Sequence, residues 1–447
     1  MTTFERETKT LELPWPFTGR DDELELVRRA LAAARPGIVV TGPAGCGKTR
    51  LVAQAVRGTD CVKVTGTPRT RQIPFAAFAH LLPETVSLHR AVHLLSSIRT
   101  LLVDDAHLLD DSSAALVHHL ALHGPTRLLV VATDGVPAPH AVTRLWTGEL
   151  LPRLCLEPLS REDTAHLADT GAGGRLEPLT AGRLHRLAGG DLRLLRDLLG
   201  AVRDRGLLDR TPEGRAWHGP VPVTATVRER TAPALERPDP AERETLDRLA
   251  FAEPLAPALD AFDPRILERL EADGLIHVDD HGAVHLAHPL YGPVLRAAAG
   301  RLRAARLTPA PDRYDAALRA EQAALTRRME RADVREEPGR VGEWLAEEGA
   351  PLPAPYAAVR ARYARLRGAP AEASAWARRG LRGAPADPDC RLELALAAAE
   401  SGDAPTARAA GTACIASAAC FMCAYRIWYG YGLEAAAPAT LFAAILM

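Results

Sequence analysis

Short apolar runs alternate with helical patterns through the first third of the chain. The strand-like runs are GIVV (37–40), CVKVTG (61–66), TLLV (100–103), TRLLVVATD (126–134) and, interrupted by Pro152, LPRLCLEPL (151–159). They are short and rich in β-branched residues, as expected of strands that are buried on both faces. Helical spacers separate them, so the pattern predicts an α/β domain with a parallel, doubly wound sheet.

A second pattern begins near residue 224. The helical runs TVRERTAPALE and PAERETLDRLAF are followed by DPRILERLEADG (263–274), where Asp263 is an N-cap, Pro264 opens the helix and Gly274 ends it. The next stretch, LIHVDDHGAVHL, alternates apolar and polar residues on both sides of a turn that contains glycine, which predicts a β-hairpin. Three helices and a hairpin predict a winged helix.

From about residue 313 the chain is helical and rich in alanine and arginine. Small residues recur 34 positions apart: Gly368 with Gly402, Ala373 with Ala407, and Ala375 with Ala409. This is the period of tetratricopeptide repeats, in which small residues let paired helices approach closely. The pattern therefore predicts TPR-like helical repeats.

Composition adds few constraints. The chain has 447 residues, 25% of them charged, and a formal net charge of −1. The chain has no excess of basic residues that would indicate binding to nucleic acid or to a membrane surface. The N-terminal stretch MTTFERETKTLELPWPF lacks the apolar core of a secretory signal. Seven cysteines without such a signal indicate a reduced, cytoplasmic protein.

Residues 42–49 carry the most specific motif, a full match to the phosphate loop GxxxxGK[ST] between a strand-like run and a helical run. Glycines let backbone N–H groups curl around a phosphate, and a compact lysine charge fits this cradle where the planar fork of arginine does not. Lysine is rare here, at positions 9, 48 and 63. The predicted phosphate-binding residues are Gly42, Pro43, Ala44, Gly45, Cys46, Gly47, Lys48 and Thr49. The implied cofactors are ATP or ADP and Mg²⁺; the alternative is a glycine-rich turn without a ligand.

Two acidic residues follow the run 100–103. Asp104 and Asp105 would stand at the carboxyl end of a parallel strand, where such sheets place their sites. We expect Thr49 and Asp104 to hold Mg²⁺, and Asp104 and Asp105 to form the catalytic pair. Aspartate at 105 is one methylene shorter than the glutamate common in ATPases, so ATP hydrolysis would be slow. Whether the chain acts as an enzyme is left open by the sequence. The alternative is two solvated acids in a loop.

Several segments resemble a known class. FTGRDDEL (17–24) resembles the hhGRExE element of STAND signal-transduction ATPases, and LLVDDAHLLD resembles the DDAHWLD segment of large ATP-binding regulators of the LuxR family. IPFAAFAHLLP (73–83), LEPLSREDTAHL (156–167) and LHRLAGGDLRLLRDLL (184–199) resemble further segments of that family, so the resemblance covers residues 17–300 in order.

The resemblance has implications for single residues. It implies that Gly19 and Arg20 border the adenine and that Thr133 or Asp134 senses the γ-phosphate. Asp134 stands where many relatives carry a sensor arginine, and an acid there would repel that phosphate. Asp191 and Leu192 replace an Asn-Pro pair, which affects a contact near the adenine.

A histidine after the predicted hairpin has two interpretations. In STAND proteins a histidine at the end of the winged helix contacts the β-phosphate of ADP, and His288 is the matching position. Alternatively, His288 caps the helix that follows it. The third helix of the module carries as many acids as bases, which does not favour DNA binding.

The segment 411–447 differs in composition, with Arg426 and Glu434 as its only charges and with Cys414, Cys420 and Cys423 close together. It is interpreted as a disordered or frameshifted tail, in place of further repeats and a helix-turn-helix; a cysteine metal site is the weaker alternative. The predicted domains are an extension 1–16, a P-loop domain 17–159, a helical lid 160–210, a winged-helix module 211–300, a TPR-like sensor 301–410 and the tail 411–447.

Together these features predict an ATP-binding switch of a LuxR-family transcriptional regulator, in which ADP/ATP exchange controls opening. A small-molecule inducer or a protein would bind the repeats, and nucleotide-dependent oligomers are expected. DNA would be a partner only with a C-terminal domain that this chain lacks, and no membrane is involved. The alternatives are an origin-recognition-like AAA+ ATPase that binds DNA through its winged helix, and a non-functional gene fragment.

Overall fold

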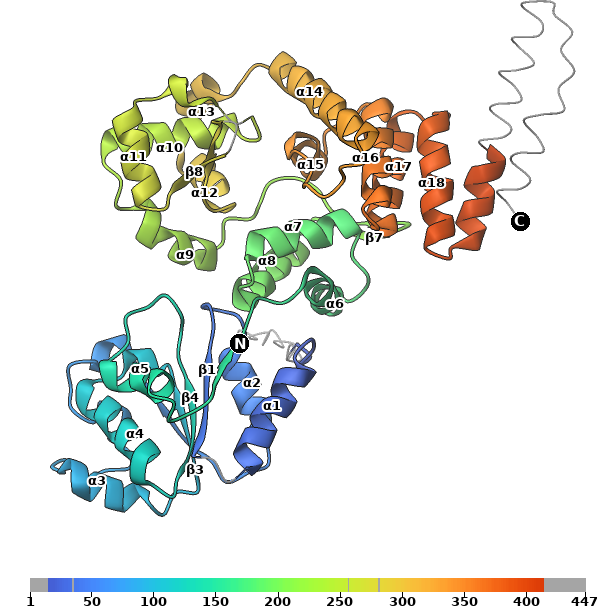
Figure 1. Ribbon diagram of the computed structural model, residues 1–447. Coiled ribbons are helices and arrows are strands. Elements are labelled where there is room, and N and C mark those ends of the chain that lie inside the picture. Colours follow the sequence, from blue (N-terminus) through green and yellow to red (C-terminus); the bar gives the residue numbers. More distant parts are fainter. Residues whose placement is uncertain (1–14, 34–35, 256, 280–281, 414–447) are drawn as a thin grey trace, which may run out of the picture. The chain divides into compact units, whose positions relative to one another are not determined.

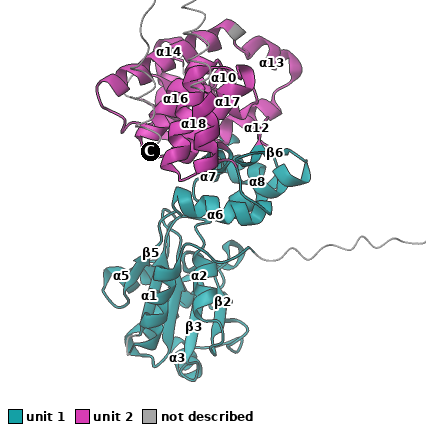
Figure 2. Ribbon diagram, turned by 90° about the vertical axis from the view of Figure 1, so that its right-hand side faces the viewer, with its two compact units in different colours: residues 1–176, 180–216, 222–237 teal, residues 177–179, 217–221, 238–447 magenta. Residues whose placement is uncertain are grey.

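The computed structural model describes residues 15–33, 36–255, 257–279 and 282–413. These residues form two compact units, coloured separately in Figure 2. Unit 1 comprises residues up to 176, 180–216 and 222–237, and unit 2 comprises 177–179, 217–221 and the chain from 238 onward.

Unit 1 contains a five-stranded parallel sheet in the order β2-β3-β4-β1-β5. Its strands are β1 (Gly37–Thr41), β2 (Val62–Thr65), β3 (Thr100–Asp104), β4 (Arg127–Val131) and β5 (Arg153–Cys155). The predicted parallel sheet is confirmed. The segment broken by Pro152 forms only a short strand at the edge of the sheet.

Helices cover both faces of this sheet (Figure 1). They are α1 (Asp21–Ala32), α2 (Lys48–Ala55), α3 (Leu88–Leu95), α4 (Asp111–His123) and α5 (His140–Thr147), with 3₁₀ turns at Pro68–Thr70, Ala76–Phe78 and Ala106–Leu108. Successive residues of β4 enter different cores. Leu128 and Val130 pack with α3, α4 and α5, and Leu129 and Val131 pack with α1 and α2. Burial on both faces explains the continuous apolar runs.

The chain continues with the three helices of the segment predicted to form the lid (160–210), a pair of short strands and one more helix, most of whose residues belong to unit 1. These are α6 (Arg161–Ala172), α7 (Pro178–Ala188), α8 (Leu192–Asp204), the paired strands β6 (Leu208–Thr211) and β7 (Gly214–Trp217), and α9 (Ala225–Leu235). The pair β6–β7 was not anticipated, because LDRT and GRAW are too short and polar to read as strands.

Helix α9 lies in unit 1, although residues 211–300 are predicted to form one module. Thr224 and Thr226 donate hydrogen bonds to Asp197 of α8, and Arg230 pairs with Asp191 at 3.1 Å. These polar contacts tie α9 to the lid. The main boundary between the two compact units therefore lies after residue 237. The sequence predicts a domain boundary after residue 210.

From residue 238 onward, the described part of unit 2 consists of helices and one hairpin. Its elements are α10 (Pro240–Ala252), a 3₁₀ turn (Leu259–Ala261), α11 (Pro264–Ala272), β8 (Ile276–Val278), β9 (Val284–Leu286), α12 (Tyr291–Ala298), α13 (Arg301–Leu307), α14 (Pro311–Glu330), α15 (Val341–Glu347), α16 (Ala354–Leu366), α17 (Pro370–Gly383) and α18 (Pro388–Glu400). The expected hairpin is the antiparallel pair β8–β9, and Asp263 caps α11 as predicted.

From α16 onward, the helices begin at positions that recur every 34 residues. Helix α18 begins at Pro388, 34 residues after α16 begins at Ala354, and the helix that follows α18 begins at Ala404, 34 after Pro370. The turns repeat too, since Gly368 and Gly402 have φ values of +78° and +74°. A period read from small residues thus corresponds to a recurring helix pair. The predicted tail is 411–447. Its residues 411–413 continue the helix that begins at Ala404, and residues 414–447, with the three cysteines, lie outside the described residues.

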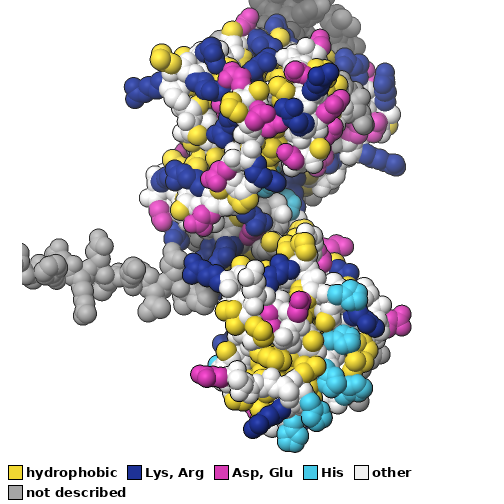
Figure 3. Space-filling model, turned by 90° about the vertical axis from the view of Figure 1, so that its left-hand side faces the viewer, with side chains coloured by type: hydrophobic (Ala, Val, Ile, Leu, Met, Phe, Trp, Pro, Cys, Tyr) yellow, Lys and Arg dark blue, Asp and Glu magenta, His cyan; other side chains and the backbone are white. Residues whose placement is uncertain are grey.

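Histidines gather on the surface formed by α3, α4 and α5 of unit 1 (Figure 3). They include His89 and His93 of α3 and His118, His119 and His123 of α4. The rings of His119 and His123 are 4.9 Å apart between centroids.

Candidate nucleotide site

The phosphate loop joins β1 to α2 in a conformation that requires glycine. Gly45 and Gly47 have φ values of +77° and +95°, where a side chain would be strained. Gly47 is also the N-cap of α2, and no side chain caps the helix there. The N–H groups of its first turn are therefore oriented toward the loop, as in anion sites at helix N-termini.

Lys48 is buried beneath this loop, with 6% of its surface exposed. Its Nζ donates to the carbonyl oxygens of Gly42 at 2.9 Å and Pro43 at 2.6 Å. These are neutral partners, so its charge is not cancelled by a carboxylate in contact with it. A buried ammonium held in this way can attract phosphate oxygens.

Thr49 and Asp104 lie together at the carboxyl end of β3, as expected. Thr49 Oγ1 donates to Asp104 Oδ1 at 3.0 Å, and the N–H of Asp105 donates to the same oxygen at 3.1 Å. Asp104 is 3% exposed. A hydroxyl and a carboxylate are hard oxygen donors of the kind that Mg²⁺ prefers, so this donor set fits the metal.

Asp105 follows in a left-handed conformation, with φ +48°. Burial, and then the charge of Asp104, raise the pKa of Asp105 above its usual value. It lines the same cavity as Lys48 and Thr49. A carboxylate of raised pKa in a cavity is a candidate for proton transfer.

His107 follows β3 and is hydrogen-bonded to the segment after β4. It was not singled out from the sequence. Its Nδ1 accepts a hydrogen bond from the backbone N–H of Thr133 at 3.3 Å, and burial lowers the pKa of this histidine. The neutral ring that results is suited to accept at Nδ1. Thr133 lines the cavity and is thus the better placed of the two expected sensors.

Asp134 has a partner that the sequence did not reveal. Arg153 of β5 donates to its Oδ1 at 2.9 Å. Repulsion of a phosphate by Asp134, expected from the sequence, is therefore reduced, because an arginine charge lies against the acid. The two residues meet because β5 and the end of β4 both flank β1.

Gly19 and Arg20 precede α1. Gly19 has φ +70°, and a Cβ there would meet Asp163 of α6 at 2.9 Å. The Arg20 guanidinium pairs with Glu23 at 2.6 Å and donates to the carbonyl of Glu157. Arg20 also lines the cavity, so its side chain joins the predicted adenine border to the segment that enters the lid.

The lid meets the phosphate loop at Asp191 and Leu192. The N–H of Leu192 donates to the carbonyl of Gly45 at 3.0 Å, and Asp191 caps α8 through the N–H groups of Arg193 and Leu194. A Cβ on Gly45 would lie 2.2 Å from the Asp191 carboxyl group. Aspartate thus supplies a helix cap and a close contact where the related segments have Asn-Pro.

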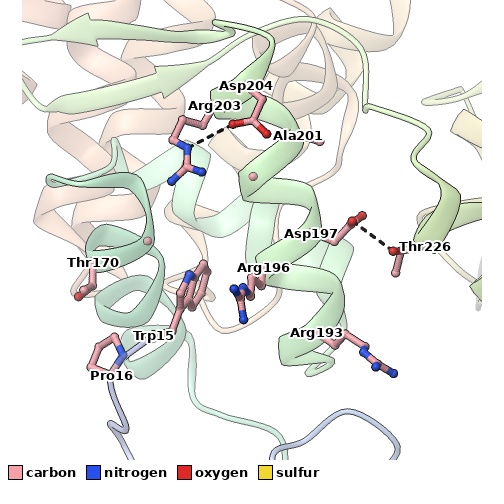
Figure 4. A pocket seen from close by; sticks show the side chains of 12 residues that line it. Trp15, Pro16, Thr170, Arg193, Arg196, Asp197, Ala201, Arg203, Asp204 and Thr226 are labelled. Carbon is pink, nitrogen blue, oxygen red and sulfur yellow. Dashed lines mark hydrogen bonds and ion pairs between the residues drawn. The ribbon is translucent and has the colours of Figure 1, made fainter. Parts of the chain in front are cut away.

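A cavity of about 770 Å³ lies between the phosphate loop and α8. Its lining includes the phosphate loop, Asp104, Asp105 and Thr133 on one side and lid residues on the other. A neighbouring cavity of about 660 Å³ shares Trp15, Pro16, Arg193 and Arg196 with it. Figure 4 shows these side chains, with the Thr226–Asp197 hydrogen bond nearby. The size fits a small-molecule ligand such as a nucleotide.

Trp15, Arg193 and Arg196 are cavity residues that sequence reasoning missed. Two arginines three apart on α8 carry no signal in a chain that uses arginine almost everywhere. Trp15 precedes the recognisable segment 17–24. Only the folded lid brings them to the same cavity.

His288 belongs to unit 2. Its Nδ1 accepts from the N–H of Leu290 at 3.1 Å at the start of α12, and its ring centroid lies 5.4 Å from that of Tyr291. This contact corresponds to the capping interpretation of His288. Its role toward a nucleotide stays a prediction.

Two further searches concern the described residues alone. None of their helices is long and apolar enough to cross a bilayer. No group of three or more His, Cys, Asp or Glu side chains within them is arranged to hold a metal ion.

Comparisons with known proteins give one family match and several distant structural similarities. The family description "AAA ATPase domain" matches residues 16–98. No curated protein matches the sequence significantly. Among solved structures, the RuvB Holliday junction branch migration motor of Thermotoga maritima is similar at 17% identity and a TM-score of 0.32, over 59% of this chain and 90% of that one.

Two structures from Pyrococcus species are also similar. A STAND protein with a tetratricopeptide repeat sensor from Pyrococcus horikoshii has 18% identity and a TM-score of 0.31, over 90% of this chain and 64% of that one. A Walker-type ATPase of Pyrococcus abyssi has 14% identity and a TM-score of 0.37, over 62% and 95%. The family match, together with the parallel sheet and the phosphate loop, makes the N-terminal part of this chain a P-loop NTPase domain that matches the AAA ATPase family description.

Proposed function

We propose that the chain is an ATP-operated switch of the STAND type, as in the ATP-binding regulators of the LuxR family. One observation carries the proposal. Leu192, at the start of the lid helix α8, donates to the Gly45 carbonyl of the phosphate loop, and the cavity beside this contact is lined by both elements. A ligand bound to the loop therefore acts directly on the contact that holds the lid.

In this proposal the nucleotide lies along the phosphate loop. Lys48 and the first-turn N–H groups of α2 bind its phosphates, and Thr49 and Asp104 hold Mg²⁺, which neutralises phosphate charge. Thr133 faces the terminal phosphate and Gly19 and Arg20 border the base. Asp105 accepts a proton from an attacking water. Its short side chain favours slow hydrolysis.

Arg193 and Arg196 supply positive charge from the lid side of the cavity. A triphosphate and a diphosphate differ in the charge that they bring to this side of the cavity. The lid position would then depend on which nucleotide is bound. A ligand shifts such an equilibrium only by its differential affinity for the two states.

The repeats of unit 2 are proposed as the sensor. The recurrence of α16–α17 at a 34-residue spacing is typical of stacked helix pairs that bind peptides or small molecules. The hairpin module of α10, α11, β8 and β9 is proposed as a winged helix with a regulatory role. Arg269 of α11 is paired with Glu242 at 2.6 Å and with Asp239 at 3.4 Å, which disfavours DNA binding by that helix.

Hydrogen exchange tests the switch. The amide of Leu192 should exchange faster in the ATP complex than in the ADP complex, because opening the lid breaks its bond to Gly45. The Lys48→Ala variant, which should bind neither nucleotide, is the control and should show no difference. Equal exchange in the two complexes, with both nucleotides bound, would refute the switch.

A further inference from the structure

Asp104 has a cationic partner that the phosphate-loop motif does not account for. Lys63 Nζ lies 2.8 Å from Asp104 Oδ2, while Oδ1 accepts from Thr49 and from the N–H of Asp105. Both oxygens of the proposed metal-holding carboxylate are therefore engaged. One of them faces a full positive charge.

The strand register makes this contact possible. Lys63 pairs with Leu102, and Thr65 pairs with Asp104, across β2 and β3. The long lysine side chain extends along the strand to the next position on its face of the sheet. Its side chain is 48% exposed, whereas that of Asp104 is 4% exposed. The ammonium can thus leave the carboxylate for solvent, but the carboxylate cannot follow it.

We propose that Lys63 is a built-in counter-ion of Asp104 that competes with Mg²⁺ and lets the site bind a nucleotide with little dependence on the metal. This inference rests on the proposed nucleotide function and adds a regulatory residue to it. Lys63 does not contact the reacting atoms, so it is a positioning residue.

The charges around the site explain why such a counter-ion matters. A buried carboxylate close to phosphates is costly unless a cation accompanies it. Lys48 donates to the carbonyl oxygens of the phosphate loop. Lys63 offsets the charge of Asp104 when no metal is present. A cation that binds Asp104 must weaken that ion pair, which lowers the affinity for Mg²⁺.

A simpler role is available for this lysine. β2 lies at the edge of the sheet, where a lysine commonly prevents pairing with another chain. That role needs a charge at the edge but does not need contact with Asp104. The two interpretations differ in how the metal dependence of nucleotide binding responds to substitution.

The test compares Lys63→Met with the parent chain. A fluorescent ADP analogue is titrated first in EDTA, and then at a fixed subsaturating concentration against Mg²⁺. We expect metal-free binding to weaken about 3- to 10-fold and the Mg²⁺ midpoint to fall by a similar factor, for a half-exposed ion pair. Opposite shifts of these two quantities are the signature of a counter-ion.

Three controls keep the test decisive. Lys63→Arg should behave like the parent, and Lys63→Gln repeats the charge removal with a different side chain. Arg57→Met removes a charge from an exposed position that is not among the cavity residues, and it should change neither quantity. Equal Mg²⁺ midpoints in the parent, Lys63→Met and Lys63→Gln, with nucleotide bound, would overturn the inference and leave Lys63 as edge protection. No nucleotide binding by the parent would refute the proposed function as well.

Discussion

Both units bury charged side chains, but they use them differently. In unit 2, Glu321 accepts from Tyr356 Oη at 2.7 Å and from the N–H groups of Val341 and Gly342, and it pairs with Arg360 at 3.4 Å. In unit 1, Lys48 and Asp104 lie beside a cavity of about 770 Å³. The unit 2 network is closed on itself, whereas the unit 1 charges face a space that a ligand can fill.

The difference separates stability from function. A fully hydrogen-bonded buried network specifies one packing of helices, and losing a member leaves the others without partners. Charges around a cavity are held ready for a charged ligand, and losing one mainly affects binding. Mutations in the two units should therefore have separable effects.

The largest expected effect is at the phosphate loop. Lys48→Ala removes the buried ammonium, and we expect ATP affinity to fall about 1000-fold, or about 4 kcal/mol, with little change in thermal stability. Calorimetric titration of ATP and a thermal melt measure the two quantities. Unchanged affinity would show that residues 42–49 form a turn without a ligand.

The counterpart in unit 2 is Glu321→Ala. It leaves the Arg360 charge and the Tyr356 hydroxyl buried without their acceptor, which should cost about 3 kcal/mol of stability. Nucleotide affinity at 25 °C should stay within twofold of the parent value. A large loss of affinity with intact stability would break the distinction between the units.

His288 belongs to unit 2, and the resemblance to STAND proteins predicts that it contacts ADP. If it does, His288→Ala should shift the ratio of ADP to ATP dissociation constants about 10- to 150-fold, as expected for a contact of about 1.5–3 kcal/mol. Binding of each nucleotide is measured separately. An unchanged ratio, together with modest destabilisation, would assign His288 to capping through the Leu290 N–H.

A smaller effect is expected in the repeats. Gly368 has φ +78° and no atom within 4 Å of a Cβ position, so Gly368→Ala introduces backbone strain but no clash. We expect a loss of about 1 kcal/mol. Gly402→Ala should behave alike, since Gly402 has φ +74° and equally open surroundings. Gly58→Ala, at φ +80° in unit 1, is the matched control and should leave the repeats unaffected. Protection of α16–α18 in hydrogen exchange reports the change, and unequal losses at Gly368 and Gly402 would argue against a structural repeat.

The smallest effect is a response to pH. In unit 1, burial lowers the pKa values of His107, His118 and His185. In unit 2, burial lowers the pKa of His277. The folded state then binds fewer protons than the unfolded state below about pH 6.5, so stability falls as the pH drops through that range.

Between pH 7.5 and 5.5 we expect unit 1 to lose more hydrogen-exchange protection than unit 2. The variant His118→Asn should reduce this loss, whereas His89→Asn, at an exposed position of α3, should not. Equal losses in both units would mean that the histidines do not control the acid response.

The phosphate loop, the strand runs and the acids after residue 103 were predictable because their chemistry is local. Glycines at fixed spacing adopt the loop conformation, and short apolar runs form strands that are buried in the sheet. The 34-residue period could also be read from the sequence, because small residues must recur where paired helices pack closely against each other. The Asn-Pro replacement at Asp191 could be seen in the sequence, but its role as cap and as contact to Gly45 could not.

What the sequence by itself determined is thus the class of the N-terminal domain and the candidate residues for binding phosphate and metal. Tertiary structure alone decided which distant charges meet. Arg153 reaches Asp134 because β5 and β4 flank the same strand, and Lys63 reaches Asp104 because β2 and β3 are in register. Ion pairs between strands depend on sheet order and register, which no spacing along the chain encodes. The same holds for Arg193 and Arg196, which become cavity residues only when α8 folds against the loop.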